Sequence, residues 1–234
     1  MYPSFSAPAL RSEPRTHEGV VVSTNIAVPF PCPNQPSRNT GINKQPCSHI
    51  SVFTPGPHYG DGSGVRGDFV GDTKHHSGAH KAVYAVAQEE LEFWSTQNDT
   101  SYSPGAFGEN LTTSGVKWSE VLINQQIRVG TAVLEVSVPR QPCRTFAEWL
   151  QVQGWVKKYA RRGDCGAYFR VVQPGEIRPQ DTLNFLAAPS HDITMGEAFR
   201  ASMGDKIAMS RIVEARIYPP FYHDRLEKIL ALSH

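Results

Sequence analysis

The sequence predicts a mostly β protein with some α structure, in which a barrel-like domain is followed by a small helical appendage. Two observations favour this fold class. Between residues 19 and 189, many short segments with β-type patterning alternate with glycine and proline turns, and few helical stretches interrupt them, which suits a barrel. From residue 190 to residue 234 the apolar pattern becomes helical.

The first half of the domain is expected to mix strands with irregular chain. Residues 20–28 have the composition of a strand, and a proline-rich segment that we expect to be turns follows to about residue 64. An apolar run, AVYAV at 82–86, leads into a short helix over 88–94. The glycine-bounded stretch 105–115 is expected to be a polar loop.

The second half contains more regular signals. Its expected elements are a strand pair over 121–129 and 131–138, a helix over 145–162 opened by the capping box Thr145-Phe-Ala-Glu148, and a hairpin over 168–172 and 181–186. In the appendage, a second capping box, Thr194-Met-Gly-Glu197, predicts a short helix, and two more are expected over 205–217 and 220–232. We expect no reactive group in these helices.

Composition limits the class of protein. A chain of 234 residues has room for one large domain, or for one domain and an appendage. Its 23 Lys and Arg residues balance 22 Asp and Glu, so we expect no nucleic-acid partner, although a local group of cations can still bind a small phosphorylated ligand. No apolar run approaches the roughly 18 residues of a membrane span. We therefore expect a cytoplasmic protein without membrane association, and a flexible tail over residues 1–18.

Cys143 has the strongest chemical interest. It lies between the expected end of a strand and the expected start of a helix, where unpaired N–H groups carry partial positive charge. Arg140 and Arg144 add full charges nearby, and such surroundings stabilise a thiolate, which attacks electrophiles or binds a soft metal. The alternative is that Cys143 is a small buried apolar residue, as unpaired cysteines often are.

The spacing of the cysteines argues against an electron source within the chain. The four cysteines contain no C-x-x-C pair, which argues against a structural zinc site and against an iron–sulfur cluster within the chain. Electrons for any reduction must then come from a separate donor.

Five motifs occur in the order found in MOSC domains: TGINKQP at 40–46, GVRGD at 64–68, HHSGAHKAV at 75–83, PGAFGENLTT at 104–113 and VPRQPC at 138–143. The chain therefore resembles this family, and in particular its stand-alone YiiM-type branch. The resemblance implies a MOSC-like β-barrel over residues 19–189, with the helical segment 190–234 behind it. It also implies a bound molybdenum cofactor (molybdopterin), with pyridoxal phosphate unlikely, Cys143 as the protein ligand of molybdenum, and reduction of hydroxylamines, hydroxylamino-purines and amidoximes.

The motifs also contain residues suited to holding such a cofactor. Lys44, Lys81, Arg140 and Arg144 are cations that can bind its anionic tail, although each can equally be a solvated surface charge. Asn110 carries an amide that donates and accepts, and the glycine before it allows close backbone approach. Alternatively, Asn110 belongs to a simple glycine turn at the start of a strand.

Histidine supplies the candidate acid. His76 lies in a turn-rich segment and can donate a proton when an N–O bond is cleaved, or it can simply hydrogen-bond the turn. Together with His75 and His80 it forms an H-H-x3-H spacing, which on its own is weak support for zinc. Tyr168 and Arg170 share one face of a strand, so they either line the pocket or face solvent.

Three functions remain open. We favour a molybdenum-dependent oxidoreductase that acts on a small N-hydroxylated molecule and receives electrons from an external flavin or iron–sulfur protein. The second function is a carrier module that binds the cofactor without turnover. The third is a metal-free thiol enzyme in which Cys143 is the nucleophile and His76 its base. The sequence does not determine the oligomeric state.

Overall fold

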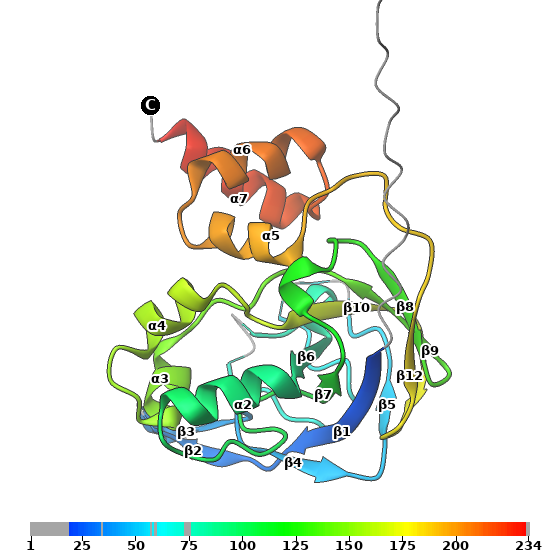
Figure 1. Ribbon diagram of the computed structural model, residues 1–234, viewed down its shortest axis with the longest axis vertical. Helices are drawn as coiled ribbons and strands as arrows, with labels where there is room; N and C mark the ends of the chain where they lie inside the picture. The colour runs from blue at the N-terminus through cyan, green and yellow to red at the C-terminus, as the bar shows by residue number, and fades with distance from the viewer. Residues whose placement is uncertain (1–18, 34, 57, 59, 73–75, 233–234) are drawn as a thin grey trace, which may run out of the picture.

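The computed structural model describes residues 19–232 except 34, 57, 59 and 73–75, so the tail expected over residues 1–18 lies outside the described residues. Within the described residues, seven strands close into a barrel, as Figure 1 shows. The ring runs in the order β12 (Thr182–Phe185), β8 (Gln126–Val129), β9 (Ala132–Val136), β10 (Ala167–Gln173), β6 (Val83–Ala87), β7 (Leu111–Ser114) and β1 (Gly19–Ala27). Pairing of β1 with β12 closes the ring, which confirms the expected barrel.

The proline-rich segment contains strands that the sequence did not reveal. They are β2 (Phe30–Cys32), β3 (Gln35–Thr40), β4 (Lys44–Cys47) and β5 (Ile50–Val52). The expectation of irregular chain was wrong because the prolines occupy tolerant positions. Pro31, Pro36 and Pro46 are exposed and lie in strands at the edge of a sheet, where a missing N–H costs little.

The expected polar loop over residues 105–115 also contains a strand. β7 pairs in parallel with β6, and its Thr112 and Thr113 are fully buried. Their hydroxyls have internal partners, since Thr112 donates to the Glu109 carboxylate at 2.9 Å and Thr113 accepts from the Trp118 indole at 3.0 Å. Polar residues that are paired in this way can form a buried strand, which is why the sequence resembled a loop.

The expected hairpin over 168–172 and 181–186 was wrong. β10 pairs with β9 and β6, whereas β12 pairs with β8 and β1. Between them, β11 (Gly175–Ile177) pairs with β5. Closure of the barrel selects these partners, and because they are distant in sequence, the local turn signals do not indicate them.

The described residues contain α2 (Gln88–Gln97), α3 (Arg144–Leu150), α4 (Trp155–Arg162), α5 (Met195–Ser202), α6 (Lys206–Ala215) and α7 (Pro220–Ala231). The helix expected over 145–162 is therefore two helices, separated where Gln151 adopts a left-handed φ of 54°. The first capping box was wrong, because Cys143 is the N-cap residue of α3 and no side chain caps the helix. None of these described helices is long and apolar enough to cross a bilayer.

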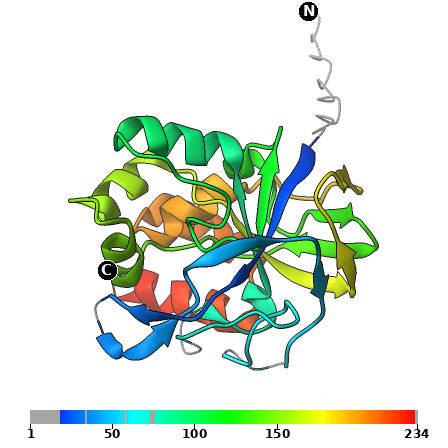
Figure 2. The ribbon, with the colours of Figure 1, turned by 90° about the horizontal axis from the view of Figure 1, so that it is seen from below.

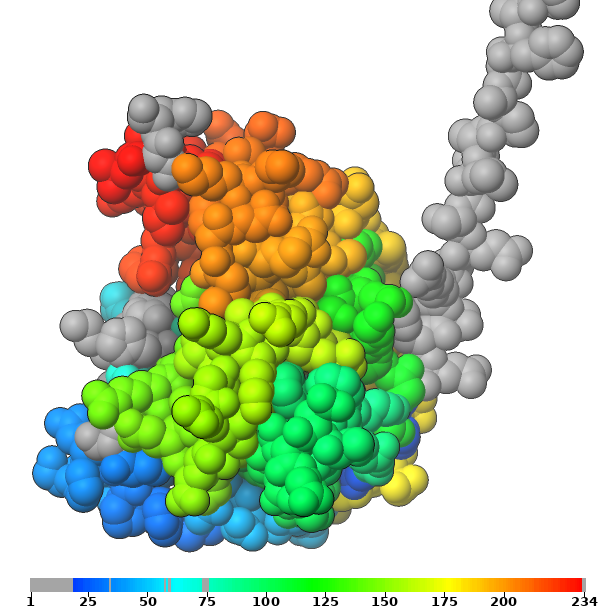
Figure 3. Space-filling view, turned by 60° about the vertical axis from the view of Figure 1, so that its left-hand side comes forward, coloured from blue at the N-terminus to red at the C-terminus, as the bar shows by residue number. Residues whose placement is uncertain are grey.

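The C-terminal helices agree with the sequence. The Thr194 hydroxyl accepts a hydrogen bond from the Glu197 N–H at 3.2 Å, which confirms Thr194 as the N-cap residue of α5. The capping box is only half formed, because the Glu197 carboxylate pairs with Arg211. Figure 1 shows α5, α6 and α7 stacked over one end of the barrel, and Figure 3 shows the same orange and red layer resting on the chain of α4. Viewed from below in Figure 2, these helices lie behind the strands.

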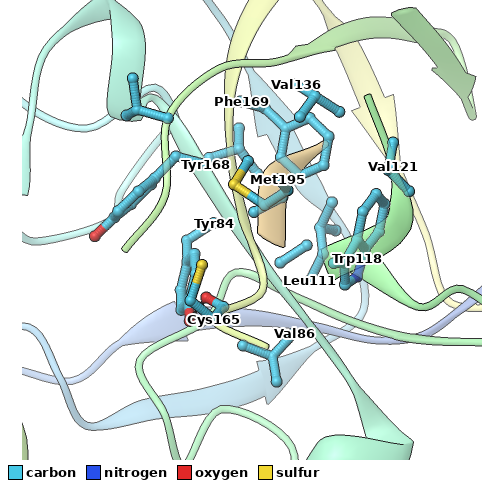
Figure 4. Close-up of a cluster of buried hydrophobic side chains, with 14 of the residues drawn as sticks. Tyr84, Val86, Leu111, Trp118, Val121, Val136, Cys165, Tyr168, Phe169 and Met195 are labelled. Carbon is cyan, nitrogen blue, oxygen red and sulfur yellow. Dashed lines mark hydrogen bonds between the residues drawn. The ribbon is translucent and has the colours of Figure 1, made fainter. Parts of the chain in front are cut away.

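The barrel and the helices share one core. A single cluster of buried apolar side chains includes barrel residues together with Met195, Phe199 and Ile212 from the helices. Figure 4 shows Met195 lying beside Phe169 and Val136 of the barrel. The expected domain boundary between residues 189 and 190 therefore stays a prediction. The hydrophobic core is continuous across it.

Met195→Ala is expected to lower the free energy of unfolding by about 2–5 kcal/mol, because it leaves a cavity where the helices meet the barrel. Met203, which is 40% exposed just after α5, gives the matched control. Met203→Ala should change the same quantity by less than about 0.5 kcal/mol. Urea denaturation followed by circular dichroism measures both variants. Equal, small losses in the two variants would contradict a shared core.

Candidate functional site

Two adjoining cavities open beside the segment that follows β9. The inner chamber is bounded by residues 38–44, by residues 68–72 and by Asn110. The outer chamber lies between residues 138–143 and the helices α5 to α7. Among the described residues, the side chains that line both chambers are Asp72, His76, Lys81, Arg140, Cys143 and Tyr168.

The structure brings most of the expected site residues together. The junction of the two chambers contains Cys143, His76, Lys81 and Arg140. The inner chamber alone is lined by Lys44 and Asn110. Arg144 lines neither chamber, because its side chain is 79% exposed and pairs with Glu148 at 2.7 Å. Its expected role at the cofactor therefore gains no support from the geometry.

Cys143 occupies the position that the sequence predicted, between a strand and a helix. It follows β9 by a short extended segment that contains Pro139 and Pro142, and it is the N-cap residue of α3. Its thiol is half-buried and is not part of a disulfide. The thiol is therefore available to a ligand or metal bound at the junction.

A buried carboxylate, Asp68, organises the inner chamber. It accepts two hydrogen bonds from the Lys44 ammonium, both of 2.6 Å, and further bonds from the Asn110 amide at 3.0 Å and the Ala27 N–H at 2.8 Å. The side chains of Lys44 and Asp68 are only 6% and 2% exposed. Burial alone would raise the pKa of Asp68, but the Lys44 ammonium and the other donors hold that pKa below its ordinary value.

These bonds limit what Lys44 and Asn110 can offer a ligand. The charge of Lys44 is balanced by Asp68. The amide of Asn110 also donates to the carbonyl of Asn25 at 3.3 Å and accepts from the N–H of Tyr84 at 3.3 Å. Both side chains therefore hold the chamber wall in place and have little capacity left for an anion.

Arg140 presents a buried charge without a carboxylate partner. The residue is 6% exposed, and its guanidinium lies 4.7 Å from the ring centre of Tyr84 and 4.3 Å from that of Phe146. It donates to the carbonyl of Phe107, its Nε has no partner, and in the described part of the chain no acid pairs with it. A buried cation without a counter-ion is unfavourable, so an anion bound in the chambers would stabilise Arg140.

Lys81 lies at the junction between two aromatic rings. Its Nζ is 5.7 Å from the ring centre of Tyr168 in β10 and 6.0 Å from that of Tyr222 in α7, which is the range of a cation–π contact. Burial, together with the nearby charges of Arg225 and Arg140, lowers the pKa of Lys81 to about 8. Lys81 therefore connects the barrel with α7 and carries a charge that titrates close to neutral pH.

The histidines give no metal cluster. His76 lies at the junction, and its backbone N–H donates to the carbonyl of Asp72 at 3.0 Å. His75 lies outside the described residues. In the rest of the described chain no three His, Cys, Asp or Glu side chains converge on one point, so the H-H-x3-H spacing gains no support as a zinc site.

The two alternating residues of β10 differ in role. Tyr168 lines both chambers, which resolves the open alternative for this residue in favour of the pocket. Arg170 lines neither, because its guanidinium pairs with Glu135 of β9 and donates to the Asn124 side chain at 2.8 Å. Arg170 differs from Tyr168 because an acidic residue on the adjacent strand pairs with its side chain.

Sequence reasoning missed Asp68 and Arg38 as site residues. Asp68 stands in the GVRGD motif. A buried lysine needs a carboxylate to balance its charge, so the burial of Lys44 would have pointed to Asp68. Arg38 lines the inner chamber, donates to the Cys32 sulfur at 3.5 Å and lies 3.8 Å from Asp72. It comes from the proline-rich segment, where no sequence signal pointed to the site.

Close backbone approach builds the wall of the inner chamber. A Cβ added to Gly41 would lie 1.8 Å from the carbonyl oxygen of Phe69, and one added to Gly71 would lie 2.0 Å from that of Asn39. The two segments that carry Lys44 and Asp68 can therefore approach this closely only with glycine at both positions.

Comparison with known proteins identifies the family. Residues 72–184 match the MOSC domain, and the uncharacterised protein YflK of Bacillus subtilis (strain 168) is 34% identical over 166 residues, which cover 71% of this chain and 72% of YflK. The chain belongs to the MOSC domain family. The crystal structure of YiiM from Geobacillus stearothermophilus superimposes with a TM-score of 0.72 at 25% identity, over 91% of this chain and 99% of that one.

A further relative bears on chemistry. A protein named reductase from Gibberella moniliformis (strain M3125 / FGSC 7600) is 28% identical over 168 residues. These residues make up 70% of this chain but only 30% of that longer protein. The resemblance to the YiiM-type branch is thus confirmed, and MOSC domains generally bind the molybdenum cofactor.

Asp68→Asn is expected to lower the free energy of unfolding by about 3–5 kcal/mol, because it leaves the buried Lys44 charge without its partner. Since the pKa of Asp68 is depressed in the folded protein, the carboxylate stabilises the fold above its ordinary value of 3.8 and ceases to do so as the pH falls below that value. Unfolding curves at pH 7 and at pH 3 measure the difference between variant and wild type, which should shrink in acid.

Glu176→Gln is the control for Asp68→Asn. Glu176 and Arg178 are 49% and 57% exposed, so their ion pair should contribute less than about 1 kcal/mol. A comparable loss in both variants at pH 7 would contradict the role of Asp68 as the centre of the chamber wall.

Lys81 should react with amine-acylating reagents in a pH range below that of ordinary lysines. With its pKa lowered to about 8, its neutral amine becomes abundant as the pH rises through 8, and acylation of the peptide that contains it should be half-maximal there. Peptide mass spectrometry measures the extent of labelling, with exposed Lys117 as an internal reference for reagent activity. Labelling that begins only near pH 10 would show that Lys81 is an ordinary solvated lysine.

Proposed function

We propose that this protein is a molybdenum-cofactor-dependent reductase of N-hydroxylated compounds in which Cys143 is the protein ligand of molybdenum. The observation that carries the proposal is the position of Cys143 at the junction of two chambers, next to the buried and unpaired charge of Arg140. Membership of the MOSC family supports the cofactor, and the relative named reductase supports the direction of the chemistry.

The residues present fit such a cofactor. A thiolate is a soft donor, and molybdenum with sulfur ligands favours soft donors. The Nε of Arg140 is a buried donor without a partner, which suits a phosphate oxygen of the cofactor tail. Lys81 adds a second cation at the same junction, and Arg38 adds a third that lines the inner chamber. When bound, the cofactor would supply a centre that accepts an oxygen atom and exchanges two electrons.

The proposed reaction converts a hydroxylamine, R–NHOH, into the amine R–NH₂ and water. The N–O bond breaks, two electrons enter, and two protons are taken up. His76 lines both chambers, so we assign it the delivery of a proton to the departing oxygen. Hydroxylamino-purines and amidoximes contain the same N–O bond and belong to the same proposed substrate class.

The electrons require a partner. No cluster of metal-binding side chains occurs in the described part of the chain, and we therefore propose a separate flavin or iron–sulfur protein as donor. We place the reaction in the cytosol, where unpaired thiols persist, since all four cysteines are free.

Cys143→Ser tests the assignment. The substitution replaces a soft thiolate by a hard, protonated hydroxyl, so protein from a cofactor-producing host should lose most of its molybdenum and at least about 100-fold in reduction of a hydroxylamine. Elemental analysis measures the metal, and product formation with a chemical electron donor measures turnover. Cys47→Ser is the control, because Cys47 lines neither chamber and its thiol bonds can be replaced by a hydroxyl.

Other results would select a different function. Wild-type protein that binds molybdenum but does not reduce hydroxylamines would be a cofactor carrier. Activity that survives removal of the metal and is lost in Cys143→Ser would indicate a thiol enzyme. Full activity in a folded Cys143→Ser protein would remove Cys143 from the site.

A further inference from the structure

The outer chamber has a second set of walls that the cofactor does not require. On one side it is lined by Cys143 and Tyr168, and on the other by small and apolar side chains of the C-terminal helices. Those apolar residues are Ala198, Ala201, Met209, Leu226 and Ile229. Tyr222, which also lines the chamber, faces Lys81 across it. An apolar cavity with aromatic walls suits a planar organic group.

Positive charges outnumber negative charges in the outer chamber. Lys81, Arg140 and Arg225 line it, and Asp72 is the carboxylate among its described lining residues. Arg225, in α7, forms no hydrogen bond or ion pair with any residue that the structure describes, although it is close enough to Lys81 to disfavour its charge. An arginine that lines an apolar chamber without pairing to an acid can bind the anionic group of a ligand.

Arg225 is separated from the proposed cofactor contacts. It lines the outer chamber only, whereas Arg38 lines the inner chamber only, and Lys81 and Arg140 lie at the junction. Cys143 lies at the junction. A cofactor held in the inner chamber would thus leave Arg225 facing the space from which a second molecule reaches the junction.

We propose that Arg225 forms a subsite in the outer chamber for the anionic group of the substrate, so that the enzyme prefers planar aromatic N-hydroxylated compounds that carry a carboxylate or phosphate. This proposal deepens the proposed function and rests on it for the identity of the reacting group. The apolar walls hold the ring, Arg225 holds the anionic group, and the N–O group is directed toward Cys143.

Binding of the unreactive amine products tests the subsite without turnover. The probes are 4-aminobenzoate and 4-aminophenyl phosphate, with aniline as the neutral parent, and calorimetry gives their dissociation constants for the cofactor-loaded protein. Wild type should bind at least one anionic probe about 10- to 100-fold more tightly than aniline, and the carboxylate and phosphate probes show which anion is preferred. The preference should decrease with added salt, because Arg225 is exposed.

Arg225→Gln should reduce the ratio of anionic to neutral affinity to near one, and Arg225→Lys should restore part of it. Lys228→Gln is the matched control, since it removes a cation from the same helix at a position that does not line the chamber. The corresponding hydroxylamines should show the same changes in the ratio of kcat/KM.

The outcomes separate the two proposals. Equal affinity of wild type for all three probes, or an unchanged ratio in Arg225→Gln, would overturn the subsite even if hydroxylamines are reduced. Loss of cofactor from Arg225→Gln would also overturn it, because Arg225 would then be a cofactor residue. Anion preference that depends on Arg225 in a protein without reductase activity would support the subsite and refute the proposed reaction.

Discussion

The ion pair between Asp68 and Lys44 is the constraint on which the site depends. Through Asp68, four parts of the chain that are distant in sequence meet at one buried carboxylate: the end of β1, the start of β4, the loop before residue 72 and the start of β7. A carboxylate accepts several hydrogen bonds at once, so it can join segments that no single backbone ladder connects. The position of the inner chamber wall follows from this one group.

The two cations at the junction are stabilised differently from the cation in the wall. Lys44 has a carboxylate, whereas Arg140 and Lys81 are placed against aromatic rings. Ring contacts position a cation but do not neutralise it. The charge of Arg140 therefore remains available to a ligand, which is the physical basis for an anion site in a protein whose total charge is only +1.

Sequence reasoning succeeded where the signal was local and failed where partners are distant. Cys143 was placed correctly because a strand and a helix adjoin it, and Thr194 because an N-cap bond spans only four residues. β7 and the partners of β12 were missed, since barrel closure and buried threonine bonds depend on residues elsewhere in the chain. Asp68 was overlooked for the same reason, as a carboxylate shows its role only once its donors are known.

The shared core of barrel and helices has a kinetic consequence. Because Met195 and its neighbours anchor α5 in the barrel, the helices that wall the outer chamber cannot swing away as a rigid lid without breaking that core. The chamber is open to solvent, so passage into it needs no more than rotation of lining side chains such as Tyr222 and Arg225. Such rotations take place within nanoseconds, whereas domain opening takes microseconds to milliseconds, so entry into this cavity should be fast compared with turnover of a typical enzyme.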